Sequence, residues 1–323
     1  MYLRVFPRTG WLISVIGYGM WGMGGWSGSD DHESARALDR AVETGCNFFD
    51  TAWAYGDGRS ERLLGELLCR HPKRELHVAT KVPPKNGQWP GKASTPADDA
   101  FPYEHILEYT RASLQNLGIS RIDLQQLHVW DDSWTAASGW RRAVEELKRA
   151  GLIQAFGISV NRWEPENIVC ALETGLVDSV QVVYNIFDQA PEDVLFPLCE
   201  RLGVAVIARV PFDEGSLTGT LTRQSHWPDG DWRNIYFAEP HLSATLRRVE
   251  LLYAVAVEAG TTLPDLALRF SLANRAVTTT IPGMRRVTHV DVNMTAGNAP
   301  PLDAAVIQSL RAHRWDRVPD DRP

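Results

Sequence analysis

The feature that most constrains the fold of this 323-residue chain is a repeated unit in which an amphipathic helix ends at a glycine and a short apolar strand follows. Glycine is favoured there because the residue after a helix often takes a left-handed backbone conformation. The unit recurs at Gly45, Gly118, Gly151, Gly175 and Gly203. Strands that alternate with helices in this way are expected to run parallel to one another.

Three further apolar runs, residues 14–16, 76–81 and 278–281, bring the expected total to about eight short buried strands. This pattern is typical of a parallel barrel or a doubly wound sheet, and the length permits one barrel or two domains. No linker divides the chain. The turn residues Thr9-Gly10 between two apolar pairs predict a small β-hairpin before the first of these strands.

Composition narrows the class of protein. The formal charge of −7 is distributed over mixed acids and bases, which argues against a nucleic-acid partner. No run approaches the roughly 20 apolar residues of a membrane span, and the N-terminus does not resemble a signal peptide. The four cysteines, Cys46, Cys69, Cys170 and Cys199, lack metal-binding spacing and are interpreted as reduced thiols. We therefore expect a cytoplasmic protein without a metal or a membrane partner.

Polar residues stand where the apolar strands end. They are Asp50, Lys81, His128, Ser159, Asn161, Gln181 and Arg209. In a parallel barrel the carboxyl ends of the strands meet at one face, which carries the active site. A single polar residue at a strand end is commonly just solvated. A set that includes an acid, an amine and an imidazole favours a catalytic site.

Residues 17–22 match the dinucleotide-binding pattern G-x-G-x-x-G, but their context differs from it. In that fingerprint the last glycine opens a helix whose N-terminus holds the pyrophosphate. Here Gly24, Gly25 and Gly28 delay the helix to about Asp31. The segment is instead interpreted as a glycine-rich loop that lets the backbone approach a ligand.

The strongest signal is the segment from Phe48 to Gly65, which resembles the aldo-keto reductase signature at nearly every position. Collinear matches extend the resemblance over essentially the whole chain, at residues 79–81, 122–128, 156–161, 180–185 and 280–283. The resemblance implies a single-domain (β/α)8 TIM barrel over residues 1–323, with long loops at the carboxyl-terminal face of the strands. It also implies NADPH-dependent reduction of a carbonyl, with the cofactor extended across that face.

By the same resemblance, Asp50, Tyr55, Lys81 and His128 are the catalytic residues, and their chemistry suits the reaction. Hydride addition leaves negative charge on the carbonyl oxygen, so an acid must deliver a proton. A free tyrosine is too weak an acid near neutrality, and we expect the Lys81 ammonium to lower the pKa of Tyr55 while Asp50 holds Lys81. His128 is expected to orient the carbonyl. A short-chain reductase is disfavoured because no tyrosine has lysine four positions later.

The cofactor residues also follow from the resemblance. Ser159, Asn161 and Gln181 are expected to hold the nicotinamide carboxamide, and Tyr184 to stack on the ring. The residues expected along the rest of the cofactor are Gly19, Met20, Asp50, Arg209, Pro211, Phe212, Gly215, Leu217, Gly283, Arg285, Arg286, His289 and Asn293. Arg285 or Arg286 could pair with a 2′-phosphate. The chain departs from the family pattern at Val292, usually an acid, and at Arg209, usually small or aromatic.

Tryptophans are concentrated in the loops that follow strands. Trp21, Trp53, Trp89 and Trp130, together with Tyr55 and His128, are expected to form the substrate pocket. Aromatic walls favour an aromatic or cyclic aldehyde or ketone, or a sugar ring. Two other functions remain open: a nicotinamide-binding regulatory subunit of the potassium-channel β-subunit kind, and oxidation of a sugar or cyclitol alcohol by the same residues. A homo-oligomer is possible.

Overall fold

A computed structural model of the chain describes residues 1–26, 28 and 30–317 and forms a parallel β-barrel. Eight strands follow one another around the sheet in chain order: β3 (Tyr18–Gly19), β4 (Phe48–Asp50), β5 (His77–Val82), β6 (Ile122–Leu127), β7 (Ile153–Ser159), β8 (Ser179–Val183), β9 (Ala205–Arg209) and β10 (Val277–Thr280). The first and last strands meet through bridges from Ile16 to Thr280 and from Gly19 to Gly283. The predicted (β/α)8 barrel is thereby confirmed.

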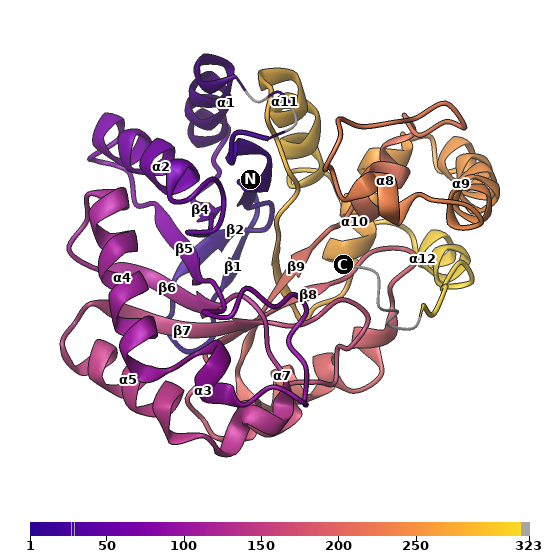
Figure 1. The fold of residues 1–323 in the computed structure, drawn as a ribbon. Helices are drawn as coiled ribbons and strands as arrows, with labels where there is room; N and C mark the ends of the chain where they lie inside the picture. The colour runs from indigo at the N-terminus through magenta and orange to yellow at the C-terminus, as the bar shows by residue number, and fades with distance from the viewer. Residues whose placement is uncertain (27, 29, 318–323) are drawn as a thin grey trace.

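Helices surround the strands (Figure 1). They are α1 (Asp31–Glu43), α2 (Arg59–Arg70), α3 (Ala97–Ala100), α4 (Tyr103–Leu117), α5 (Ser138–Arg149), α6 (Val169–Glu173), α7 (Leu195–Leu202), α8 (Arg233–Tyr236), α9 (His241–Glu258), α10 (Leu263–Ala273), α11 (Val287–Ala296) and α12 (Ala304–Arg311). The five glycines predicted to follow helices all have positive φ, which explains why each helix gives way to a strand there.

The predicted N-terminal hairpin is present, and it closes one end of the barrel. Strands β1 (Leu3–Val5) and β2 (Leu12–Ser14) are antiparallel. Phe6, Trp11 and Ile13 pack in one buried cluster with the barrel residues Phe48 and Leu124. The hairpin side chains therefore fill this end of the barrel, opposite the end at which the barrel strands terminate.

The first barrel strand lies later than the sequence predicted. We expected it at residues 14–16, but Ser14 belongs to the hairpin strand β2, and the strand that pairs with β4 is β3. After β3 comes a 3-10 turn, η1 (Trp21–Met23), and α1 begins only at Asp31. The side chain of Asp30 caps that helix by accepting a hydrogen bond of 2.8 Å from the Glu33 amide. The predicted delay of the helix to about Asp31 is confirmed, whereas the interpretation of residues 17–22 as a loop is wrong in part, because Tyr18 and Gly19 form strand β3.

Two structural observations concern membranes and metals. Among the described residues no single helix is both long and apolar enough to cross a membrane; only α9 and α10, taken together as a pair bent by 85°, have that length and composition. The same residues contain no cluster of three or more His, Cys, Asp or Glu arranged to hold a metal ion.

Candidate active site

A cavity of about 1040 Å³ opens at the carboxyl-terminal ends of the strands. Its walls come from the loops that follow β3, β4, β5, β6, β7, β9 and β10. This volume is at the upper end of the ~300–1000 Å³ range of small-molecule sites. The cavity is therefore large enough for a dinucleotide and a second small molecule.

Lys81 contacts two of the other predicted catalytic residues, Asp50 and Tyr55. Its ammonium nitrogen donates to Asp50 Oδ1 at 2.5 Å, to the Thr51 carbonyl at 2.8 Å and to the Tyr55 hydroxyl at 3.4 Å. The lysine side chain is fully buried, beneath the cavity and not part of its wall. All three ammonium protons thus have acceptors, which fixes the position of the charge below Tyr55.

The Asp50 carboxylate is held from two directions. Opposite Lys81, its Oδ2 accepts hydrogen bonds from Gln181 Nε2 at 2.8 Å and from Gln126 Nε2 at 3.1 Å. Burial alone would lower the pKa of Lys81, but the negative charge of Asp50, with the interactions that Lys81 makes with Tyr55, outweighs it and raises that pKa. Lys81 is therefore a cation, and Asp50 neutralises it.

Tyr55 is a neutral phenol at the cavity wall. Burial raises the pKa of Tyr55 above its ordinary value of 10, although the positive charges of Lys81 and Arg209 act to lower it. The sequence predicted that Lys81 would lower the pKa; its contribution has that sign, but removal of the hydroxyl from water has the larger effect. The consequence is a hydroxyl that keeps its proton until a strong base develops beside it.

His128 follows β6 and lies at the cavity next to Tyr55. Their ring centres are 5.5 Å apart, with the rings nearly perpendicular. Burial, with the charges of Lys81 and Arg209, lowers the pKa of His128 well below 6.5. The imidazole is therefore neutral at pH 7. Its Nδ1 is buried and has no hydrogen-bond partner among the described residues.

The predicted carboxamide-binding residues differ in their availability. Ser159 and Gln181 line the cavity. Asn161 also lines the cavity, but its amide is already engaged: Oδ1 accepts from Gly91 N at 3.2 Å, and Nδ2 donates to Gly91 O at 3.0 Å and to Glu164 Oε2 at 2.8 Å. Asn161 therefore ties the loop after β5 across the cavity instead of presenting a free amide to a ligand.

Tyr184 does not occupy the position that was predicted for it. The residue is 1% exposed and is absent from the cavity wall. Its ring packs against Phe196 and Phe270, and its hydroxyl donates to Glu192 at 2.6 Å. Tyr184 is a core residue because it begins the turn after β8 pointing outward, so its expected stacking on a nicotinamide ring is wrong.

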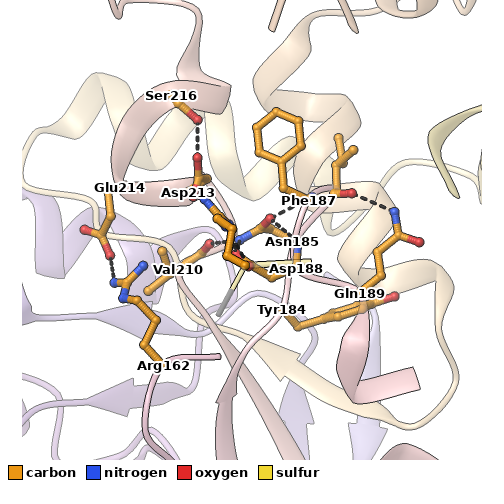
Figure 2. A network of polar contacts seen from close by, with 12 residues as sticks. Arg162, Tyr184, Asn185, Phe187, Asp188, Gln189, Val210, Asp213, Glu214 and Ser216 are labelled. Atoms are coloured by element: carbon orange, nitrogen blue, oxygen red, sulfur yellow. Dashed lines mark hydrogen bonds and ion pairs between the residues drawn. The ribbon is translucent and has the colours of Figure 1, made fainter. Parts of the chain in front are cut away.

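The loop after β9 is a strained segment held by polar contacts (Figure 2). Val210, Asp213 and Glu214 have positive φ, which is unusual for residues other than glycine. Asn185 Nδ2 donates to Val210 O at 3.0 Å, Ser216 donates to Asp213 at 2.7 Å, and Glu214 forms an ion pair with Arg162. These contacts compensate the backbone strain and fix the loop over the cavity.

The end of the described chain also holds this loop. Arg317 forms ion pairs with Asp188 and Asp213 and donates to the Tyr236 hydroxyl at 2.6 Å. Tyr236 in turn donates to Asp213 at 2.6 Å. The Arg317 side chain is 5% exposed, so the pairs are shielded from water. Arg317 thus supports the loop that covers the cavity, and no local pattern around residue 317 indicates this role.

Residues of the predicted adenosine site are divided between cavity and surface. Gly283, Arg285 and His289 line the cavity. Arg286 is exposed. Burial of His289 is the main cause that lowers the pKa of this histidine, and the charge of Arg286 adds to the effect. The buried residues Asn293 and Leu217 do not reach the cavity wall.

Glu33 is an acid near these arginines that was not predicted from the sequence. Glu33 Oε1 accepts a hydrogen bond of 3.1 Å from the Val287 amide, the first residue of α11, and Glu33 is also paired with Arg36. The contact between Glu33 and Val287 joins positions 254 residues apart, and no local signal reports it. A negative charge therefore stands at the same helix N-terminus as Arg286.

The remaining predicted cofactor residues, Gly19, Met20, Arg209, Pro211, Phe212 and Gly215, all line the cavity. The backbone also leaves room for a ligand: a methyl group on Gly215 or Gly283 would meet no protein atom within 4 Å. Open space at two glycines, the unpartnered His128 nitrogen and the cationic Arg285 at one end together fit an anionic dinucleotide.

Aromatic rings form much of the cavity wall, but only partly those that were predicted. Trp21 and Trp89 line it, and Trp89 lies 4.7 Å from His128 between ring centres. Trp53 is outside it, packed on Tyr109, and Trp130 is fully buried against Trp134 and Trp140. The substrate roles predicted for Trp53 and Trp130 are therefore wrong, since neither ring faces the cavity.

Other aromatic residues take those places. They are Trp26, Trp163, Trp232 and Tyr236, and all line the cavity. Trp26 meets Tyr55 edge-on with ring centres 6.1 Å apart. The three tryptophans lie in loops after strands, as Trp21 and Trp89 do. The number of residues between a tryptophan and the preceding strand therefore does not predict whether its ring lines the cavity.

The chain is similar to known proteins over nearly its whole length. The profile of the Aldo/keto reductase family matches residues 15–314. The chain is 31% identical to the NADH-specific methylglyoxal reductase of Escherichia coli over 309 residues, which cover 90% of this chain and 92% of that protein. It is 27% identical to a probable voltage-gated potassium channel subunit beta of Arabidopsis thaliana, with coverage of 95% and 94%. Among solved structures, the holo form of an aldo-keto reductase from Bacillus halodurans is similar with a TM-score of 0.78 and 27% identity, covering 100% of this chain and 99% of the other.

Proposed function

This chain belongs to the aldo/keto reductase family, and from that premise we propose that it reduces an aldehyde or ketone to an alcohol with NADPH, using Tyr55 as the proton donor. The observation that carries the proposal is the chain of contacts from Asp50 through Lys81 to the Tyr55 hydroxyl, which ends at the cavity wall beside His128.

Each residue has a distinct role in this proposal. When bound, the dihydronicotinamide supplies a hydride to the carbonyl carbon. The Tyr55 hydroxyl gives its proton to the carbonyl oxygen, and the Lys81 ammonium stabilises the phenolate that remains. Asp50 keeps Lys81 in place. Neutral His128 donates a hydrogen bond to the carbonyl oxygen and orients it, because an imidazole with a depressed pKa carries one N–H donor.

We assign Ser159 and Gln181 to the carboxamide of the nicotinamide. Ser159 makes no side-chain hydrogen bond within the described residues, and Gln181 uses only its nitrogen, for Asp50 and Gln126. Arg285 and Arg286 are assigned to the 2′-phosphate of NADPH because charge-assisted hydrogen bonds favour that group. Glu33 opposes this preference by electrostatic repulsion, so we expect NADH to be accepted more weakly but not rejected.

The proposed substrate is flat or ring-shaped. Trp26 and Trp89 flank Tyr55 and His128 on two sides, and Trp21 stands 5.3 Å from Trp26 between ring centres. Such walls bury an aromatic, cyclic or sugar-like carbonyl compound by apolar contact and stacking. The free hydroxyl and imidazole would supply the polar contacts at the reacting carbonyl.

The test is a titration of the purified protein with NADPH and NADH, followed by their oxidation against a panel of aromatic aldehydes, cyclic ketones and sugars. Binding with carbonyl-dependent oxidation supports the proposal. If the protein binds neither dinucleotide, the proposed function is wrong.

A second candidate is a regulatory subunit that binds the dinucleotide but serves a partner, because one relative bears the name of a potassium channel subunit beta. The two candidates differ in turnover. Binding without oxidation of any carbonyl in the panel, with co-purification of a membrane protein, would favour the regulatory function.

A further inference from the structure

Arg209 extends across the end of the barrel beneath the proposed nicotinamide site. It is the last residue of β9, yet its Nη2 donates at 3.0 Å to the carbonyl of Val160, which follows β7. Strand β8 lies between β7 and β9, so the side chain passes over the end of β8. Val160 stands directly after Ser159, one of the residues assigned to the carboxamide. The guanidinium therefore borders that assigned site.

The charge of Arg209 is not neutralised by an ion pair within the described residues. Lys81 is paired with Asp50, and Arg162 is paired with Glu214. Within the described part of the chain, no carboxylate forms an ion pair with Arg209, and its buried Nε has no hydrogen-bond partner. Burial lowers the pKa of Arg209 to about 10, so the group remains a cation at neutral pH. Its charge acts to lower the pKa of both Tyr55 and His128, although burial raises the pKa of Tyr55 overall, so its field reaches the reacting centre.

We propose that the positive charge of Arg209 makes this site bind the reduced dinucleotide in preference to the oxidised one, so that the enzyme is loaded mainly with the reduced cofactor when both forms are present. The inference rests on the proposed function, because it takes the nicotinamide to be held by Ser159 and Gln181.

The physical reason is that the two forms of the cofactor differ in charge at one place only. The oxidised nicotinamide ring carries a positive charge, the reduced ring is neutral, and the phosphates are the same in both. A nearby cation repels only the oxidised ring. When both forms compete for the site, a difference in affinity changes the ratio of their occupancies by the same factor. Arg209 thereby acts on which form of the cofactor occupies the site.

The experiment measures the dissociation constants of NADPH and NADP⁺ for the wild-type protein, Arg209→Gln and Arg209→Lys by tryptophan fluorescence at constant ionic strength. Arg209→Gln keeps a hydrogen-bond donor and loses the charge, whereas Arg209→Lys keeps a charge in mildly acidic buffer. We expect the ratio of the NADP⁺ to the NADPH constant to fall by about tenfold in the glutamine variant and to change by less than about twofold in the lysine variant.

The alternatives give different results. Equal weakening of both cofactors in Arg209→Gln would mean a phosphate contact, and unchanged cofactor constants with a higher KM for the carbonyl would mean a substrate contact; either overturns the inference. If wild-type protein binds neither dinucleotide, the proposed function fails and the inference with it. Arg209→Met provides a second neutral variant should Arg209→Gln not fold, as judged by circular dichroism.

Discussion

Lys81 and Asp50 form an ion pair in which the lysine side chain is fully buried and that of the aspartate is 3% exposed, with 2.5 Å between the nitrogen and the carboxylate oxygen. Two charges removed from water in this way depend on each other, because either one alone would be an uncompensated charge in a medium of low polarity. The pair therefore links stability to the chemistry proposed for Tyr55.

The first prediction concerns this pair. Lys81→Met should abolish turnover and lower the free energy of unfolding by ~3–5 kcal/mol, because it leaves the Asp50 carboxylate buried without its counter-ion. The double variant Lys81→Met/Asp50→Asn should regain part of that stability and none of the turnover. Guanidinium denaturation and activity assays measure both quantities. A double variant no more stable than the single one would contradict the coupling.

The second prediction separates chemistry from binding at Tyr55. Tyr55→Phe removes only the proton donor, so carbonyl reduction should fall by roughly 10²–10⁴-fold while the dissociation constant of NADPH changes little. Tyr109→Phe is a matched control, because Tyr109 packs on Trp53 outside the cavity. Single-turnover measurements with each variant decide the point. Unimpaired reduction by Tyr55→Phe would mean that another group delivers the proton.

The third prediction is the effect of an acid on cofactor choice. Replacing Glu33 with Gln keeps an acceptor for the Val287 amide but removes the negative charge at the start of α11. The preference for NADPH over NADH should rise by about two- to fivefold, the scale of a partly screened charge pair. Glu43→Gln on the exposed side of α1 should leave the preference unchanged. The readout is the ratio of the two dissociation constants at low salt.

The fourth prediction contrasts two tryptophans. Trp130→Ala should cost ~3–5 kcal/mol of unfolding free energy because its ring fills a buried stack with Trp134 and Trp140. Trp89→Ala, at a residue that is 42% exposed, should cost little stability and raise the KM for aromatic carbonyls. Thermal denaturation and steady-state kinetics distinguish the two effects. The reverse pattern would restore the pocket role first expected of Trp130.

The fifth prediction follows from the depressed pKa of His128. Below pH 6.5 the unfolded chain binds a proton at this histidine that the folded protein does not, so acid weakens folding. The contribution is therefore present above pH 6.5 and is lost as the pH falls, by up to about 1.4 kcal/mol per pH unit. His128→Gln should show a shallower loss of unfolding free energy between pH 6.5 and 5. Parallel curves for the two proteins would mean that His128 titrates normally.

The sequence predicted the barrel well because its signals are local. Glycines after helices, apolar strands and the polar residue at each strand end are read within a few positions, so the placement of Asp50, Lys81 and His128 at one face could be anticipated. The first barrel strand was predicted too early in the chain because one apolar stretch contributes its first part to the hairpin strand β2 and its later part to the barrel strand β3.

What the sequence could not predict depends on distant partners. Trp26 and Trp130 look alike as loop residues, and packing against Trp134 and Trp140 makes Trp130 a core residue. The engagement of Asn161 by Gly91 and the pairing of Glu33 with Val287 span 70 and 254 positions. Tyr184 was misplaced for a related reason, since it packs against Phe196 in α7 and Phe270 in α10, and no pattern around Tyr184 indicates these partners.

The seam between β3 and β10 has a consequence for the chain as it is synthesised. The Thr279 hydroxyl donates to the Ser14 carbonyl across 265 positions, and Ile16 bridges Thr280. The N-terminus of a nascent chain leaves the ribosome first. One edge of the sheet is therefore exposed long before the strand that covers this edge has been made. During that interval the open edge is available to other chains, so a slow or truncated translation product exposes a surface for aggregation that the finished barrel lacks.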